Sequence, residues 1–187
     1  MAHPRRTPDI PALLHALERH DVRCIVVGSV VALLRGVELT PGDLDVVPAT
    51  DRENLERLAA ALREVEARPP GPFGAWTRRD DGGWKWVARP TTEAELAAWR
   101  PDPDDPASFD QLFTTKHGDL DVVPRVCGTY EELLPRAERL RLAGADVLVA
   151  QLDEVLSRIE SVERAKDRDR IGPMRALRDR DEEAESS

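Results

Sequence analysis

Apolar residues recur along the chain with two different periods, and their alternation predicts a mixed fold. Spacing of three and four residues, as in Ile10, Leu13, Leu14 and Leu17, is typical of amphipathic helices, whereas short β-branched runs are typical of buried strands. Helices are expected at 10–19, 30–35, 51–67, 130–138, 151–163 and 165–178, and strands at 22–27, 43–47, 84–87, 109–115, 119–123, 139–142 and 146–149. Because helices and strands alternate but some neighbouring strands resemble hairpins, we expect an α/β or α+β fold with a mixed β-sheet flanked by helices.

The length of 187 residues predicts one domain over 1–187. Residues 69–110 hold all four tryptophans and several prolines, so we expect an irregular β-rich insertion that is too broken for a core of its own. Residues 150–180 are expected to form a helical C-terminal part, and 181–187 a disordered acidic tail.

The composition narrows the classes of function. The 27 Lys and Arg against 36 Asp and Glu give a net charge of −9, which disfavours non-specific coating of nucleic acid or membranes. Two cysteines cannot form a dense disulfide framework, so a reducing cytoplasm is the expected location. Residues 1–8 lack an apolar signal core, and the longest apolar stretch, 25–34, is too short to span a bilayer. We therefore expect no membrane partner.

One heptapeptide, Gly-Asp-Leu-Asp-Val-Val-Pro, occurs twice, at 42–48 and 118–124. In a strand, residues two apart share a face, so Asp43 lies with Asp45 and Asp119 with Asp121. Carboxylates held this close repel one another, and a divalent cation such as Mg²⁺ relieves the repulsion. Solvated turn aspartates are the alternative for either pair alone; two pairs together favour a metal site.

A second candidate element lies upstream, where Gly28-Ser29 separates a buried strand from a helix. Glycine allows the backbone to approach a phosphate closely, a helix N-terminus offers unpaired N–H groups, and the serine hydroxyl adds a hydrogen bond or a cap. The dipeptide alone does not indicate a phosphate site specifically. It becomes a stronger indication because an Asp-x-Asp strand follows one helix later.

Gly28-Ser29, the following helix and Asp43-Leu44-Asp45 together resemble the signature of the DNA polymerase beta-like nucleotidyltransferase superfamily. The resemblance implies a nucleotidyltransferase fold in which the turn holds a triphosphate. It also implies that two Mg²⁺ ions, with Mn²⁺ as the alternative, bind Asp43, Asp45 and a third acid. Asp121 matches the third position, with Asp119 in support.

The C-terminal part is similar to small bacterial nucleotidyltransferases related to the abortive-infection toxins of type IV toxin–antitoxin pairs. Arg164-Ala165-Lys166-Asp167 before the last helix carries this resemblance, which implies a catalytic role for Lys166 and an antitoxin protein as partner. Lys116 is a further candidate for phosphate contact, and an ion pair with its neighbours is the alternative for Lys166. The sequence departs from the family pattern at Ile159, where a lysine is common, and lacks the arginine before the Asp-x-Asp strand.

The expected function is therefore Mg²⁺-dependent transfer of a nucleotide from a nucleoside triphosphate to an acceptor hydroxyl. RNA, a protein and a small molecule all remain open as the acceptor. The alternative is a catalytically weak or inactive module that binds nucleotide or a partner on the same fold. Ile159 and the missing arginine favour that alternative, whereas the intact carboxylates favour the enzyme.

Overall fold

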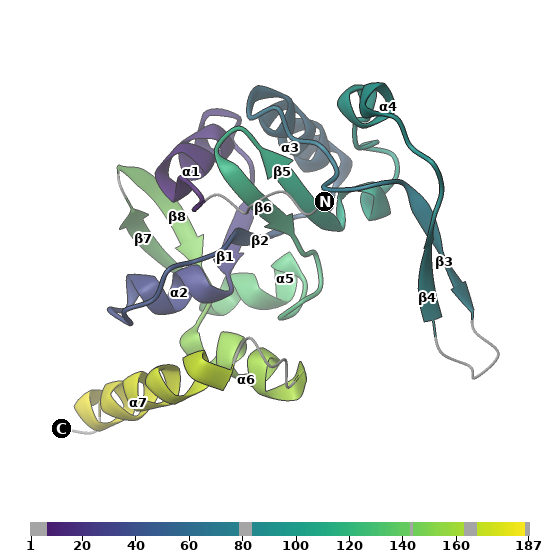
Figure 1. Cartoon of the computed structure of the whole chain (residues 1–187). Helices are drawn as coiled ribbons and strands as arrows, with labels where there is room; N and C mark the ends of the chain where they lie inside the picture. The colour runs from purple at the N-terminus through teal and green to yellow at the C-terminus, as the bar shows by residue number, and fades with distance from the viewer. Residues whose placement is uncertain (1–6, 79–83, 143, 163–167, 186–187) are drawn as a thin grey trace.

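The structure is a computed structural model and describes residues 7–78, 84–142, 144–162 and 168–185. Within these residues the chain forms a six-stranded mixed sheet flanked by helices, and a separate two-stranded hairpin (Figure 1). The fold class predicted from the sequence is confirmed.

The large sheet has the strand order β5-β6-β2-β1-β8-β7. Its strands are β1 (Cys24–Val27), β2 (Leu44–Pro48), β5 (Gln111–Thr115), β6 (Gly118–Val122), β7 (Glu138–Leu142) and β8 (Ala145–Val149). β1 runs antiparallel to β2 and parallel to β8, β2 runs parallel to β6, and both outer pairs are antiparallel hairpins. The central strands β1 and β2 are almost wholly buried, as expected for strands covered on both faces.

Helices surround this sheet, and their apolar faces supply much of the core. They are α1 (Ile10–Arg19), α2 (Ser29–Leu34), α3 (Arg52–Glu64), α4 (Glu93–Ala98), α5 (Tyr130–Leu133), α6 (Leu152–Val162) and α7 (Arg168–Glu185). Figure 1 shows α1 and α3 side by side, with α2 and α5 on the side of the sheet nearer to α6 and α7. None of the helices in the described ranges is both long and apolar enough to cross a membrane.

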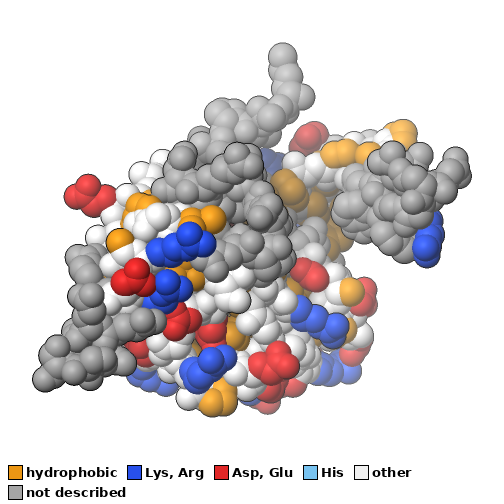
Figure 2. Space-filling view, turned by 90° about the horizontal axis from the view of Figure 1, so that it is seen from below, with side chains coloured by type: hydrophobic (Ala, Val, Ile, Leu, Met, Phe, Trp, Pro, Cys, Tyr) orange, Lys and Arg blue, Asp and Glu red, His pale blue; other side chains and the backbone are white. Residues whose placement is uncertain are grey.

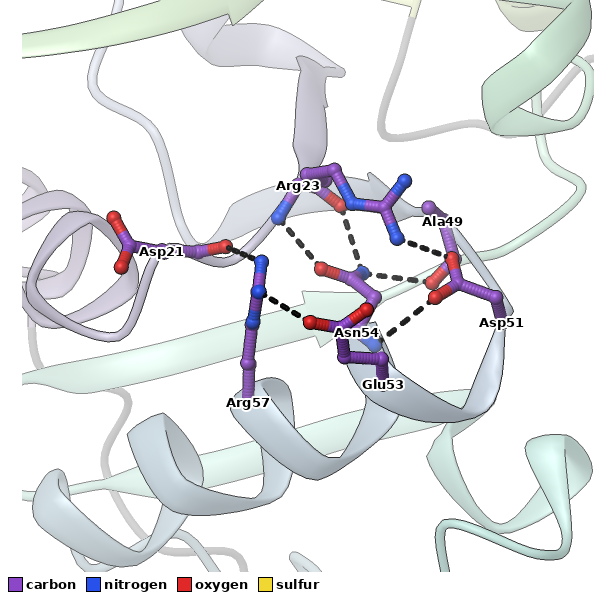
Figure 3. A network of polar contacts seen from close by, with 7 residues as sticks. All are labelled: Asp21, Arg23, Ala49, Asp51, Glu53, Asn54 and Arg57. Carbon is purple, nitrogen blue, oxygen red and sulfur yellow. Dashed lines mark hydrogen bonds and ion pairs between the residues drawn. The ribbon is translucent and has the colours of Figure 1, made fainter.

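A buried amide ties one end of the β1–β2 pair to α3 (Figure 3). Asn54 is fully buried; its Oδ1 accepts the backbone N–H of Arg23 at 2.7 Å, and its Nδ2 donates to the carbonyls of Arg23 and Ala49 at 3.0 and 2.8 Å. Asp51 caps α3 by accepting from the N–H of Asn54 and pairs with the Arg23 guanidinium at 2.6 Å. These contacts fix the strands at the end opposite to Gly28 and Asp45.

The insertion is more regular than the sequence predicts. β3 (Gly74–Arg78) and β4 (Trp84–Ala88) form an antiparallel hairpin that projects from the body in Figure 1, and α4 begins with a capping box between Thr92 and Glu95. The sequence predicts β4 but neither β3 nor α4. β3 opens with glycine and alanine, which are depleted in strands.

Several helix boundaries also differ from expectation, among them the end of α3 at Glu64 rather than at 67. The helix expected over 130–138 ends at Leu133, and a 3-10 turn covers Leu134–Arg136, because Pro135 has no N–H to continue the α-helix. At the C-terminus, α7 continues to Glu185, so the expected disordered tail is helical from 181 to 185. Glutamate and alanine, which dominate that stretch, are good helix formers.

Candidate metal centre

The two copies of the repeated heptapeptide lie side by side on the neighbouring strands β2 and β6. They run parallel and in the same register, so that Leu44 pairs with Leu120, Asp45 with Asp121 and Val46 with Val122. Identical leucines and valines are suited to pack together, but identical aspartates place like charges opposite each other, which is unfavourable in a sheet. The repeat thus concentrates negative charge at one place.

Asp43, Asp45 and Asp121 converge at this place. Each offers one carboxylate oxygen, and the three oxygens lie within 4.8 Å of one another. Asp43 lies in the bend before β2, Asp45 within β2 and Asp121 within β6, and all three residues are half-buried. We refer to these residues as the acidic trio. Oxygen ligands at this spacing suit a hard divalent cation.

Gly28 lies directly against the acidic trio. It ends β1, next to the pairing of Val27 with Asp45, and its φ of +71° favours glycine. A Cβ atom on this residue would lie 2.1 Å from Oδ2 of Asp45. Any other residue here would therefore displace that carboxylate, so glycine is required both for the turn and for the position of Asp45.

Ser29 follows as the first residue of α2 and is 6% exposed. Its Oγ has no hydrogen-bond partner within the described part of the chain. A buried hydroxyl left unpaired costs roughly 1–3 kcal/mol. A ligand oxygen next to Gly28 would remove that cost, which supports the predicted role of this turn in holding a phosphate.

Three predicted site residues belong neither to the acidic trio nor to the Gly28-Ser29 turn. Asp119, two residues before Asp121 on β6, pairs with Thr114 of β5, and the ammonium of Lys116 lies 3.7 Å from a carboxylate oxygen of Glu66. Lys166 lies outside the described residues. Their roles in metal and phosphate binding stay predictions.

Cys24, in β1, is partly buried and packs against the core. Burial raises the pKa of its thiol to about 12, so the thiol is neutral near pH 7 and is a poor nucleophile. All three carboxylates of the acidic trio were predicted from the sequence, and no other carboxylate, cysteine or histidine in the described ranges joins them. The pairing of the two heptapeptides with each other was not predicted.

Comparison with solved structures finds an antigenic nucleotidyltransferase-like protein from Paracoccidioides brasiliensis. The TM-score is 0.48 at 15% identity, and the match covers 90% of this chain and 72% of that chain. No protein-family model matches the sequence, and no curated protein sequence is detectably similar to it. The chemistry of the site must therefore be judged from its own residues.

Proposed function

We propose that this protein is a metal-dependent nucleotidyltransferase that moves a nucleotide from a nucleoside triphosphate to an acceptor hydroxyl. The observation that carries the proposal is the acidic trio, with three carboxylate oxygens within 4.8 Å of one another, directly beside the Gly28 turn. A cation-binding carboxylate cluster beside a turn that admits a phosphate is the combination that phosphoryl transfer needs.

The donor set fits Mg²⁺, with Mn²⁺ as the alternative. Mg²⁺ binds through a few carboxylate oxygens and completes its shell with waters and substrate phosphates, and Asp43, Asp45 and Asp121 supply such oxygens. When bound, such ions neutralise the triphosphate and make the acceptor hydroxyl more acidic.

We infer a role for each residue from the order of the strands. Gly28 and Ser29 follow β1, Asp45 lies on the adjacent β2, and Asp121 lies one strand further on β6. In this proposal Gly28 and Ser29 receive the triphosphate, and Asp121 orients the acceptor hydroxyl and takes its proton. The acceptor oxygen forms a bond to the α-phosphorus as the bond from that phosphorus to the bridging oxygen breaks, and pyrophosphate leaves.

Calorimetry with each nucleoside triphosphate, with and without Mg²⁺, tests the binding step, and pyrophosphate release in the presence of RNA, protein and small-molecule acceptors tests transfer. Asp45→Asn and Asp121→Asn should abolish Mg²⁺-dependent turnover, and Asp119→Asn should only impair it. Asp110→Asn, which changes an exposed carboxylate elsewhere, is the matched control and should keep full turnover. Full turnover by Asp45→Asn would refute the metal mechanism.

Two narrower questions have separate tests. Tight Mg²⁺-dependent nucleotide binding without product from any acceptor would favour the non-catalytic module over the enzyme. The role as a toxin of a toxin–antitoxin pair predicts that induced expression arrests bacterial growth and that Asp45→Asn relieves the arrest. If the wild type and Asp45→Asn both arrest growth, the toxicity does not depend on this site.

A further inference from the structure

β7 is an edge strand of the large sheet and carries alternating arginines. Its residues Arg139 and Arg141 are exposed, whereas Leu140 and Leu142 pack against the core. Neither arginine has an ion pair among the residues that the structure describes. In a chain with a net charge of −9, two such arginines about 7 Å apart on one strand face are a distinct local feature.

The backbone groups of these two residues point away from the sheet. Opposed residues in an antiparallel pair either exchange both hydrogen bonds or exchange none. Asp146 of β8 opposes Arg141, but its N–H donates to a carboxylate oxygen of Glu18 at 3.1 Å. Arg141 therefore exchanges no backbone hydrogen bond with β8, and neither does Arg139 two residues earlier. The N–H and C=O of both are directed to the open edge.

The opposite edge of the sheet is partly covered by the chain itself. On β5, Thr114 exchanges two backbone hydrogen bonds with Arg68, at 3.0 and 2.9 Å, and just beyond the strand the N–H of Lys116 donates to the carbonyl of Val65. No comparable segment covers the outer side of β7 in the described ranges. The edge at β7 therefore offers more of its backbone groups to another chain.

β7 is also fixed in place from its inner side. Glu138 forms an ion pair with Arg35 at 2.9 Å and accepts a hydrogen bond from Gln151 at 2.9 Å. Burial raises the pKa of the Glu138 carboxyl, but these contacts outweigh that effect and lower it below its usual value. A strand anchored at its first residue is a preorganised template, which reduces the entropic cost of pairing.

We propose that the edge of β7 binds an extended acidic segment of a partner protein, which adds to the sheet as a further strand. Backbone hydrogen bonds to Arg139 and Arg141 would hold the segment, and acidic side chains at alternate positions would meet the two guanidinium groups. A second copy pairing through its own β7 would place arginine near arginine. A nucleic acid has phosphate acceptors for the N–H groups, but its backbone has few donors for the carbonyls.

The test uses the full-length protein and a synthetic seven-residue peptide with glutamate at alternate positions and valine or threonine between. Titration should show saturable binding, and the amide protons of Arg139 and Arg141 should become protected from exchange. The variant Arg139→Glu/Arg141→Glu should bind this peptide at least about tenfold more weakly, and should instead bind the matching lysine peptide. Arg63→Glu, which reverses an exposed charge on α3, is the control and should change neither affinity.

Three results would overturn the proposal. The first is equal binding of a peptide whose alternate amides are N-methylated, because that peptide keeps its charges but cannot form the backbone ladder. The second is binding of a single-stranded oligonucleotide, with no binding of the peptide. The third is no binding of the glutamate peptide at millimolar concentration. Circular dichroism of the charge-reversed variant and of Arg139→Gln/Arg141→Gln, each compared with the wild type, separates a loss of binding from a loss of fold.

Discussion

At the scale of single residues, the acidic trio brings carboxylates close together, and we expect their repulsion to be relieved by a bound cation. Asp45 and Asp121 oppose each other in register, and the absence of a side chain on Gly28 leaves room for the Asp45 carboxylate. Such an arrangement favours ligand binding at the expense of the stability of the free protein.

Replacing Asp45 with asparagine should therefore raise the melting temperature in the presence of a chelator. Removing one of two facing charges is expected to stabilise the free protein by about 1 kcal/mol, or roughly 2–4 °C for a chain of this size. Adding Mg²⁺ should reverse the order, because only the wild type gains binding free energy. Thermal melts of both proteins, with Asp110→Asn alongside, measure this; an unchanged or lower melting temperature of Asp45→Asn in chelator would argue against repulsion in the trio.

At the scale of elements, the site depends on how firmly β1, β2 and α3 are joined. Asn54 makes this connection through three hydrogen bonds to the backbone of Arg23 and Ala49 (Figure 3). A buried amide with all of its polar atoms paired is a specific lock between elements.

The substitution Asn54→Ala should destabilise the protein by roughly 2–3 kcal/mol, because it leaves buried backbone groups without partners. Urea unfolding followed by circular dichroism provides the measurement. Arg63→Ala, on the exposed side of the same helix, should change the free energy of unfolding by less than about 0.5 kcal/mol. Equal effects of the two changes would show that the network contributes nothing specific.

At the scale of the whole molecule, the β3–β4 hairpin is an appendage of the body. Its strands pair with each other in a separate two-stranded sheet, and Thr77, Arg78, Val87 and Ala88 are exposed. At its base, the N–H of Arg89 donates to the carbonyl of Phe73 at 2.7 Å, so the two ends lie close enough for a short connection. Further along the chain, Trp99 packs against Phe113 and so attaches the insertion to β5.

Replacing residues 74–88 by two glycines should consequently leave the fold intact and the melting temperature within about 4 °C of the wild type, since the hairpin forms a sheet separate from the large one. Mg²⁺-dependent nucleotide binding should persist, while the choice of acceptor should change. A protein that folds but no longer binds Mg²⁺ and nucleotide would show that the hairpin belongs to the metal site. Replacing the whole of α3 (Arg52–Glu64) by two glycines should unfold the protein and serves as the comparison.

The surface drawn in Figure 2 shows basic and acidic side chains interspersed, without a broad area of one sign among the coloured residues. On the face that is drawn, the coloured residues therefore present no extended area of positive charge to a polyanion. Recognition of an acceptor would then depend on local groups rather than on the overall field of the molecule.

Local patterns in the sequence predicted the elements better than their arrangement. The helical spacing of α1 and α3 and the β-branched run of β1 are strong signals, because each element buries its own apolar face. The pairing of β2 with β6 joins segments far apart in the chain, and no local period encodes it. Two arguments selected Asp121 over Asp119: its place beside the apolar Val122 and Val123, where packing restrains its rotamer, and the resemblance to a known signature. The structure brings Asp121 into the trio.

The repeated heptapeptide also has a consequence for how the chain folds. Two identical strands offer the growing sheet the same side chains, so packing alone cannot decide which copy occupies which position. Chain connectivity decides instead: β6 closes onto β5 through the tight turn at Lys116 and His117, which is a fast local event, and this removes one copy from the competition. Lengthening that turn would slow correct folding by letting the copies exchange places, with little effect on the stability of the finished sheet.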